Sequence, residues 1–201
     1  MPASQFLVLA SGSKTRKKML ENAGIAITVS PPVVDEGAIK ESLISEGVRA
    51  RDIADALAEA KARTAAYQHP DSMVLAADQI LALDEKIFSK AKTREDAVAA
   101  LKLLSGKKHK LVSAAVVYEQ GQPVWRHVDE AVLTVRPLSD AFIDQYLERL
   151  GEDAFWSVGC YQLEGLGAQL FEKIEGDYFT ILGLPLLPLL DFLRRRSMLQ
   201  V

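Results

Sequence analysis

Short apolar runs alternate with helical patterns through the first part of the chain. Three predominantly apolar runs, each five residues long, predict strands buried on both faces of a sheet. These runs are Phe6–Ala10, Ile25–Val29 and Met73–Ala77. After the first run, apolar residues recur at helical spacing up to Gly24, which predicts a helix that ends there. An alanine-rich region, Ile39–Tyr67, predicts a longer helical part with an interruption at Gly47.

The second part of the chain predicts a long hairpin and further amphipathic helices. The stretches His109–Glu119 and Val124–Val135 flank the turn sequence Gln120–Gln122, which favours antiparallel pairing. The third strand is predicted to end at Asp78–Gln79, and the apolar segment Ile80–Leu83 follows it. The other predicted elements are a hairpin return over Lys86–Lys92, helices from Thr93, Ser139 and Pro185, and a strand pair at Leu170–Glu175 and Phe179–Leu182. Because helices alternate with buried strands and one long hairpin, the predicted fold class is α/β: a mixed, twisted sheet with flanking helices.

The composition fits one globular domain over residues 1–201. Lys and Arg total 24 against 27 Asp and Glu, so the formal net charge is −3. The chain has no global basic field, so nucleic acid is not an expected partner and any phosphate site must be local. A single cysteine, Cys160, fits a reducing compartment, and the expected location is cytoplasmic. No membrane contact is expected, because the apolar stretch Ile181–Leu193 is shorter than the roughly 20 residues that span a bilayer.

The loop Ser11–Ser13 leads into a helix whose first turns carry basic side chains, Lys14 and Arg16 among them. Backbone N–H groups at a helix N-terminus attract anions, whereas basic residues there oppose the helix dipole. A polyanionic ligand would explain why basic residues stand at this position. The alternative is a serine N-cap followed by a solvated basic face, and the spacing is not that of a P-loop.

A second candidate is Asp78, which directly follows the third apolar run. Open α/β sheets bind their ligands at the carboxyl ends of strands. A carboxylate in that position can hold Mg²⁺, with water and substrate phosphate as the other ligands, or can act as a general base. The alternative is a turn-forming aspartate, because Asp is common where strands end.

Several other charged residues could join such a site. They are Asp35, Glu36, Lys61, Lys90 and Glu164. Carboxylates and lysines together suit metal-assisted phosphoryl chemistry, in which cations neutralise phosphate oxygens. Each of them taken alone is more simply a solvated surface residue, and the histidines show no metal-ligand spacing. Cys160, next to Tyr161, is expected to be a small buried residue and not a nucleophile.

Sequence blocks along nearly the whole chain, from Phe6 to Leu193, resemble the Maf family of nucleotide pyrophosphatases. The blocks, in family order, are LASGSKTRKKMLENAGI, VDE, LAEAKA, AADQILALDEKIFSKAK, LSGKKH and EGLGAQLFEKIEGDYFTILGLPL. The resemblance implies a mixed α/β structure of two lobes around a cleft, related to that of inosine triphosphate pyrophosphatases. It further implies hydrolysis of the α–β phosphoanhydride of a nucleoside triphosphate, a divalent metal cation (Mg²⁺ or Mn²⁺) and a homodimer.

The resemblance also implies site residues, motif by motif. The implied catalytic residues are Asp78, Lys90 and Lys61. The implied substrate-binding residues are Ser11, Ser13, Arg16, Glu36, Gln79 and Glu164. The implied metal ligands are Asp78 and Glu36. Arg16 can bind phosphate through two N–H groups at once, whereas Lys61 and Lys90 would act as point charges on the leaving group.

Three positions depart from the family pattern. Lys14 and Ala91 stand where the family usually has proline, and Ser89 stands where it has glycine. These changes alter loop geometry and spare the charged groups, so they bear on rate and substrate fit more than on the reaction. They leave open an alternative function, a nucleotide-binding regulator of septum formation with little catalysis.

Gln79 and Glu164 bear on which nucleotide base the protein recognises. Maf proteins that act on dTTP and UTP resemble one another in an aspartate–threonine pair and an isoleucine–glutamine–glycine block. The corresponding Asp78–Gln79 and Leu163–Gly165 resemble the branch that acts on 7-methyl-GTP. A carboxylate at Glu164 can accept hydrogen bonds from a guanine edge and attract the positive charge of the methylated ring. A dTTP or UTP pyrophosphatase is the alternative.

Overall fold

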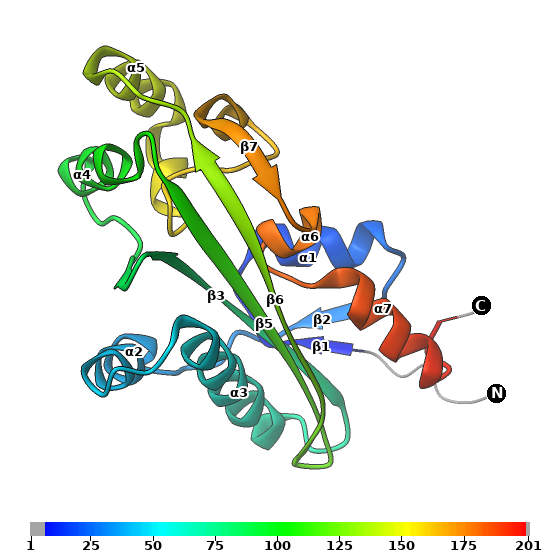
Figure 1. The fold of residues 1–201 in the computed structure, drawn as a ribbon. Coiled ribbons are helices and arrows are strands. Elements are labelled where there is room, and N and C mark those ends of the chain that lie inside the picture. Colours follow the sequence, from blue (N-terminus) through cyan, green and yellow to red (C-terminus); the bar gives the residue numbers. More distant parts are fainter. Residues whose placement is uncertain (1–6, 200–201) are drawn as a thin grey trace.

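The computed structural model describes residues 7–199, which fold around a twisted seven-stranded sheet (Figure 1). The strands are β1 (Leu7–Leu9), β2 (Ile27–Val29), β3 (Met73–Leu83), β4 (Lys86–Ile87), β5 (Lys108–Glu119), β6 (Gln122–Val135) and β7 (Phe171–Glu175). Their order is β2–β1–β3–β5–β6–β7, and β4 pairs with the end of β3. β1 pairs in parallel with β2 and β3, whereas β3, β5, β6 and β7 pair antiparallel. The prediction of a mixed sheet is confirmed.

Helices cover both faces of this sheet. They are α1 (Lys14–Asn22), α2 (Glu36–Ser45), α3 (Ala50–Gln68), α4 (Arg94–Leu104), α5 (Asp140–Leu150), α6 (Tyr178–Ile181) and α7 (Leu186–Arg195), with the 3₁₀ helices η1 (Gly151–Phe155) and η2 (Leu166–Leu170). α3 covers one face, α1 and α7 cover the other, and α4 and α5 lie at one end of the long strands (Figure 1). Within residues 7–199, no helix has the length and apolar character needed to cross a bilayer.

The alternation of side chains along β3 explains these layers. Successive residues of a strand point to opposite faces, so Val74 and Ala76 pack beneath α3. Leu75 and Ala77 pack on the other face, beneath α1 and α7. Fully burying a Leu or Val side chain contributes roughly 1.5–3 kcal/mol relative to leaving it exposed. Because both faces are covered, β3 is buried along almost its whole length, which explains its continuous apolar run.

Three buried clusters divide the molecule into two lobes. The first lobe contains the cluster beneath α3 and the cluster beneath α1 and α7, both built on β1 and the first half of β3. The second lobe contains the cluster formed by α4, α5 and η1 with Leu81, Leu111 and Leu133 of the sheet. Since β3 and β5 contribute residues to both lobes, the sheet itself joins them.

Capping side chains and one glycine set the helix boundaries. Side chains that accept hydrogen bonds from backbone N–H groups of a first turn belong to Ser13, Asp35, Thr93 and Ser139. The alanine-rich region is interrupted at Gly47, whose φ of 71° is left-handed, as the sequence predicts. α2 and α3 are therefore separate helices, and α2 begins at Glu36, three residues before the predicted start at Ile39.

The third strand is longer than predicted, which corrects the position of Asp78. β3 pairs with β5 from Val74 to Ala82. Its neighbour on the other side, β1, ends at Leu9, opposite Leu75. Asp78 therefore lies in the middle of a strand, and the interpretation that placed it at a strand end or in a turn is wrong. It does lie just beyond the carboxyl end of β1, where that edge of β3 becomes open.

Two other predicted strands also differ from the structure. The segment Phe179–Leu182 forms the short helix α6 and its C-terminal cap, because the Asp177 side chain accepts the Thr180 N–H and starts a helical turn. The hairpin return predicted over Lys86–Lys92 is limited to the two residues of β4. Phe6, the first residue of the first predicted strand, lies outside the described residues.

Candidate active site

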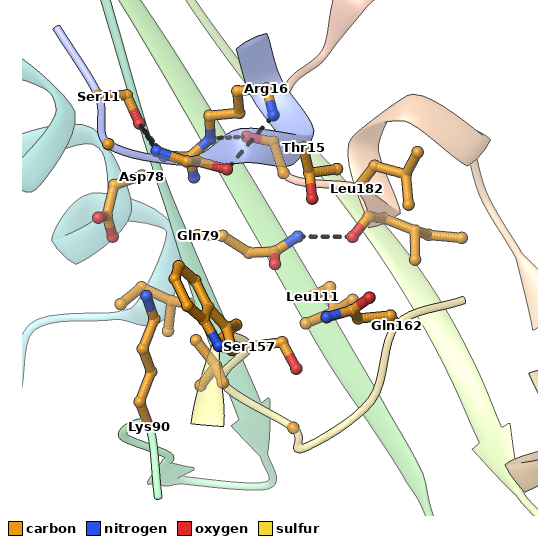
Figure 2. Close-up of a pocket in the computed structure, with 18 of the residues that line it drawn as sticks. Ser11, Thr15, Arg16, Asp78, Gln79, Lys90, Leu111, Ser157, Gln162 and Leu182 are labelled. Carbon is orange, nitrogen blue, oxygen red and sulfur yellow. Dashed lines mark hydrogen bonds between the residues drawn. The ribbon is translucent and has the colours of Figure 1, made fainter. Parts of the chain in front are cut away.

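A cavity of about 750 Å³ lies between the two lobes. Ligand pockets typically measure ~300–1,000 Å³, so this cavity can take a molecule of nucleotide size. Figure 2 shows Ser11 and Arg16 on the same side of the cavity as Asp78, with Lys90 reaching toward them from the other side. The start of α1 and the middle of β3 therefore face one common cavity.

Arg16 is held in one orientation by the protein. Its Nε donates to the Gly183 carbonyl at 2.7 Å, and its Nη1 donates to the Ala77 carbonyl at 2.8 Å and to Ser11 Oγ at 3.2 Å. Burial lowers the pKa of Arg16, and nearby carboxylates, first that of Asp78, oppose the shift. An arginine fixed in this way meets an anionic ligand with little further loss of side-chain entropy.

The two serines at the start of α1 both accept backbone hydrogen bonds. Ser13 Oγ accepts the Arg16 N–H at 3.3 Å and thereby caps α1, so the N-cap interpretation is correct for this residue. Ser11 Oγ accepts the Ser13 N–H at 3.2 Å. A hydroxyl that accepts still carries its own proton, so both serines, which line the cavity, can also donate to an anionic oxygen.

A buried lysine joins the two carboxylates of the site. Lys61 of α3 is 6% exposed, and its Nζ lies 2.6 Å from Asp78 Oδ1 and 2.8 Å from Glu36 Oε2. The surface interpretation that fits Lys61 taken alone is therefore wrong. Asp78 is also buried. Breaking a buried charge pair leaves an uncompensated charge, so each partner fixes the other in place.

The carboxylate oxygens around Lys61 fit a hard metal cation that binds together with a phosphate. The described residues contain no group of three or more His, Cys, Asp or Glu side chains able to enclose a metal ion. Asp78 and Glu36 nevertheless bring two carboxylates to one ammonium group. Mg²⁺ is usually held by one or two carboxylates, with water and substrate phosphate as the other ligands. The donor set therefore fits an open site of this kind and not a closed one.

Two more lysines face these carboxylates. Lys90 follows β4 and lines the cavity; partial burial there lowers its pKa, and the charge of Arg16 adds to the effect. Lys40 of α2 is half-buried in the cavity wall, and burial lowers its pKa as well. The sequence analysis missed Lys40, although it follows Glu36 by four residues and so shares its helix face. Cations outnumber carboxylates in this part of the cavity, which favours a polyanionic ligand.

Gln79 presents a hydrogen-bond acceptor to the cavity. Its Nε2 donates to Ser113 Oγ at 3.0 Å and to the carbonyls of Thr180 and Ile181 at 3.1 and 3.0 Å. Figure 2 draws one of these bonds. Because these carbonyls can only accept, they identify the NH₂ end of the amide and leave Oε1 for a ligand. The sequence analysis missed Ser113, whose hydroxyl donates to the Thr180 carbonyl at 2.7 Å and completes this arrangement.

The second lobe supplies a more exposed part of the wall. Glu164 lines the cavity and is exposed. Trp156 also lines it, is 53% exposed, and lies with its ring centroid 4.5 Å from the Lys14 ammonium, a cation–π contact between the lobes. The sequence analysis missed Trp156 as a site residue. Asp35 caps α2 and is not among the residues that line the cavity.

Fold and site together define a class of protein: a mixed α/β structure whose interlobe cleft suits a polyanionic ligand. The family model for Maf-like protein matches residues 6–196. The chain belongs to the Maf-like protein family.

Relatives of known name match over almost the whole chain. The nucleoside triphosphate pyrophosphatase 1 of Jannaschia sp. (strain CCS1) is 54% identical over 96% of this chain and 97% of its own length. The nucleoside triphosphate pyrophosphatase of Caulobacter vibrioides is 53% identical, with coverages of 97% and 98%. The 7-methyl-GTP pyrophosphatase of Rhizobium meliloti (strain 1021) is 50% identical, with coverages of 94% and 95%.

One solved structure is more distantly similar. The nucleoside-triphosphatase / dITP/XTP pyrophosphatase of Mycobacterium abscessus is 15% identical, covers 64% of this chain and 72% of its own, and superposes with a TM-score of 0.36. This similarity is too low to support an argument about either the fold or the site.

Proposed function

We propose that this chain is a nucleoside triphosphate pyrophosphatase. It binds a nucleoside triphosphate between the lobes and hydrolyses the α–β phosphoanhydride, which releases the nucleoside monophosphate and pyrophosphate. The observation that carries this proposal is the Lys61 ammonium, which joins Asp78 and Glu36 in the same cavity as the immobilised Arg16. The names of the relatives from Jannaschia and Caulobacter support the same reaction.

The roles of the residues follow from their charges and hydrogen-bonding groups. Donors to the triphosphate oxygens come from Ser11, Ser13 and Arg16. Lys61 and Lys90 add positive charge where the bond to the leaving pyrophosphate breaks. Asp78, held by Lys61 at 2.6 Å, is the group that accepts the proton of the attacking water.

A divalent metal cation, Mg²⁺ or Mn²⁺, is part of the proposal. Asp78 and Glu36 would hold it through carboxylate oxygens, together with phosphate oxygens of the substrate. Such a cation neutralises phosphate charge and lowers the pKa of a bound water. Turnover should be lost when a chelator removes the metal and should return when the metal is added back.

The proposed substrate is 7-methyl-GTP, with dTTP or UTP as the alternative. Gln79 Oε1 and the Glu164 carboxylate are both acceptors, and a guanine edge offers N–H donors. The charge of Glu164 also attracts the positively charged methylated ring. The name of the relative from Rhizobium meliloti supports this choice.

The proposal retains a single domain over residues 1–201, a homodimer and a cytoplasmic location. The one cysteine of the sequence, Cys160, is buried, and burial raises the pKa of its thiol to about 11, in keeping with a reducing compartment. The homodimer follows from the family resemblance, and sedimentation equilibrium would test it directly.

A substrate panel tests the proposed function. The purified protein is incubated with Mg²⁺ or Mn²⁺ and with 7-methyl-GTP, GTP, dTTP, UTP or CTP, and pyrophosphate and orthophosphate are assayed separately. We expect pyrophosphate release, with the highest kcat/KM for 7-methyl-GTP. Orthophosphate as the primary product would contradict the cleavage position, and a higher kcat/KM for dTTP or UTP would favour the alternative substrate. Nucleotide binding without turnover would favour the regulator of septum formation.

A further inference from the structure

Lys40 connects the two lobes at the edge of the cavity. α2, which carries it, packs on the first lobe through Ile39 and Leu43. The Lys40 ammonium donates to the Phe88 carbonyl at 2.5 Å and to Ser89 Oγ at 3.3 Å, just after β4. Phe88 belongs to the buried cluster of the second lobe. A single side chain therefore links a helix of one lobe to the backbone of the other.

The segment that Lys40 contacts also carries Lys90. Phe88 and Ala91 are buried in the second lobe, whereas Ser89 and Lys90 between them are exposed. Within residues 7–199, Ser89 and Lys90 take part in no backbone–backbone hydrogen bond. Neither Ser89 nor Ala91 restricts the backbone as a proline would. The direction in which Lys90 points therefore depends on how its neighbours are held.

We propose that Lys40 is a positioning residue for Lys90. By holding the Phe88 carbonyl and the Ser89 hydroxyl against α2, Lys40 fixes the Ser89–Lys90 segment so that Lys90 faces the carboxylates of the first lobe. A charged donor makes a stronger hydrogen bond than a neutral one. A catalytic group displaced by about 1 Å can cost on the order of 100-fold in rate. This inference rests on the proposed function for one point only, the assignment of Lys90 to the leaving pyrophosphate.

Hydrogen exchange tests whether Lys40 restrains the segment at Phe88 and Ser89, without reference to any reaction. Lys40→Met keeps most of the apolar stem of the side chain and removes the donor. We expect the Phe88 amide, which donates to the Leu81 carbonyl at 3.0 Å, to exchange roughly tenfold faster in this variant, since a restraint worth about 1.4 kcal/mol corresponds to that factor. Glu41→Ala is the matched control, because Glu41 is exposed on the same helix and does not line the cavity. Unchanged exchange of the Phe88 amide in Lys40→Met would overturn the proposal.

A second variant distinguishes loss of the Lys40 contact from a general destabilisation of α2. Lys40→Arg retains a positively charged donor on a side chain of similar length. It should keep the exchange of the Phe88 amide within about threefold of the wild type. If Lys40→Arg and Lys40→Met accelerate exchange equally, and exchange within α2 rises as much, Lys40 only stabilises its own helix and the proposal is wrong.

A double-mutant cycle with Lys90 tests the consequence for turnover. If Lys40 acts through Lys90, Lys40→Met should lower kcat on the order of 10-fold to 100-fold with little change in KM. The same substitution should have almost no further effect in a Lys90→Ala background. Lys40 also lines the cavity, so the competing role is direct contact with substrate phosphate. If the effects of Lys40→Met and Lys90→Ala on kcat are independent and multiply, and Lys40→Met raises KM, Lys40 contacts substrate phosphate directly. That result would overturn the positioning role.

The two tests also distinguish the failure of the inference from the failure of the proposed function. If the wild-type protein hydrolyses no nucleoside triphosphate, the proposed function is wrong, while the exchange experiment still decides whether Lys40 holds the segment. If the wild type is active and exchange of the Phe88 amide does not respond to Lys40→Met, the inference is wrong and the proposed function stands.

Discussion

The two lobes contribute very different walls to the same cavity. In the first lobe, Arg16, Lys61 and Asp78 are each held by hydrogen bonds or ion pairs to other parts of the protein. In the second lobe, Trp156 and Glu164 are exposed. Pre-organised charges lower a reaction barrier most effectively, because they need not rearrange during the reaction. Under the proposed function, the end of the cavity that binds phosphate is therefore set before binding, whereas the end that binds the base is more exposed.

The interactions on the two walls also differ in strength. Removing Lys61 from its buried pair with Asp78 costs about 3–5 kcal/mol, because the Asp78 charge then stays buried without its ion-pair partner. An exposed cation–π contact such as Lys14–Trp156 contributes about 0.5–1 kcal/mol. Substitutions on the first lobe should therefore affect the reaction itself, and those on the second lobe should affect the choice of substrate.

The largest effect is expected from Asp78→Asn, which should lower kcat about 1,000-fold. The substitution removes the proposed proton acceptor, and general base catalysis typically contributes ~10²–10⁴-fold. Nucleotide affinity should change much less, because Arg16 and the two serines that precede α1 remain. Steady-state assays of pyrophosphate release and calorimetric titration with a nucleotide measure the two quantities separately.

Asp84→Asn is a matched control for this prediction. Asp84 is exposed in the turn after β3 and has a φ of 51°, a left-handed conformation that asparagine also adopts readily. It should keep kcat within about twofold of the wild type, the range expected of a neutral surface substitution. Wild-type turnover in Asp78→Asn would remove the chemical role assigned to the first lobe.

Arg16→Lys should have the next largest effect, a fall of about 100-fold in kcat/KM. Lysine keeps the charge but cannot hold Gly183 and Ala77 while it also presents a planar pair of donors to phosphate. Arg63→Lys, on the exposed face of α3, is the control and should leave kcat/KM unchanged. Competition assays, in which two substrates are present together, give kcat/KM for each variant. The variants are compared under conditions in which their stabilities match. Similar kinetics for Arg16→Lys and Arg63→Lys would mean that charge alone is sufficient at this position.

Glu164→Gln should change substrate choice and leave the reaction intact. We expect the ratio of kcat/KM for 7-methyl-GTP over GTP to fall about tenfold, equivalent to about 1.4 kcal/mol, because the amide no longer attracts the positively charged ring. Glu172→Gln, an exposed residue of β7, controls for the loss of one negative charge. An unchanged ratio would show that the second lobe does not recognise the methylated base through this carboxylate.

The layers of the fold could be predicted because they follow from local periodicity. Continuous apolar runs mark β1 and the first part of β3, and two long strand-forming stretches on either side of the turn at Gly121 mark the hairpin of β5 and β6. The predicted end of β3 was wrong, because Asp78 is an isolated charge after an apolar run and such a charge resembles a strand terminus. The strand tolerates this charge because Lys61, 17 residues earlier in the sequence, neutralises it from α3. That contact leaves no trace in the local pattern.

Much of the site followed from the family resemblance, and little of it followed from local patterns. Lys61 was assigned to solvent because it is charged, yet its spacing from Ile53 and Leu57 puts it on the buried face of α3. Lys40 and Ser113 were missed because their roles depend on partners far along the chain. Lys40 contacts a carbonyl 48 residues away, and Ser113 contacts one 67 residues away. Only the folded topology brings such groups together.

The second lobe has a buried histidine in its core, and this residue makes the free energy of unfolding depend on pH. His109 is 2% exposed, and its Nε2 lies 2.6 Å from the Tyr161 hydroxyl. Its Nδ1 is buried and has no hydrogen-bond partner among the described residues. Burial lowers the pKa of His109 from 6.5 to about 4. The folded protein therefore holds a neutral imidazole at pH values where the unfolded chain carries a proton.

The smallest effect we predict follows from this difference. Because the pKa is lowered in the folded state, the unfolded chain binds the extra proton as the pH falls below about 6.5, and the free energy of unfolding decreases until about pH 4. Between pH 7 and pH 5.5 the expected decrease is about 1 kcal/mol, from ~1.36 kcal/mol per unit of pKa difference. Urea unfolding at both pH values should show that His109→Gln, which keeps a hydrogen-bonding group near Tyr161, is less sensitive to pH by that amount. If the two proteins lose the same stability on acidification, His109 does not control the pH response of the second lobe.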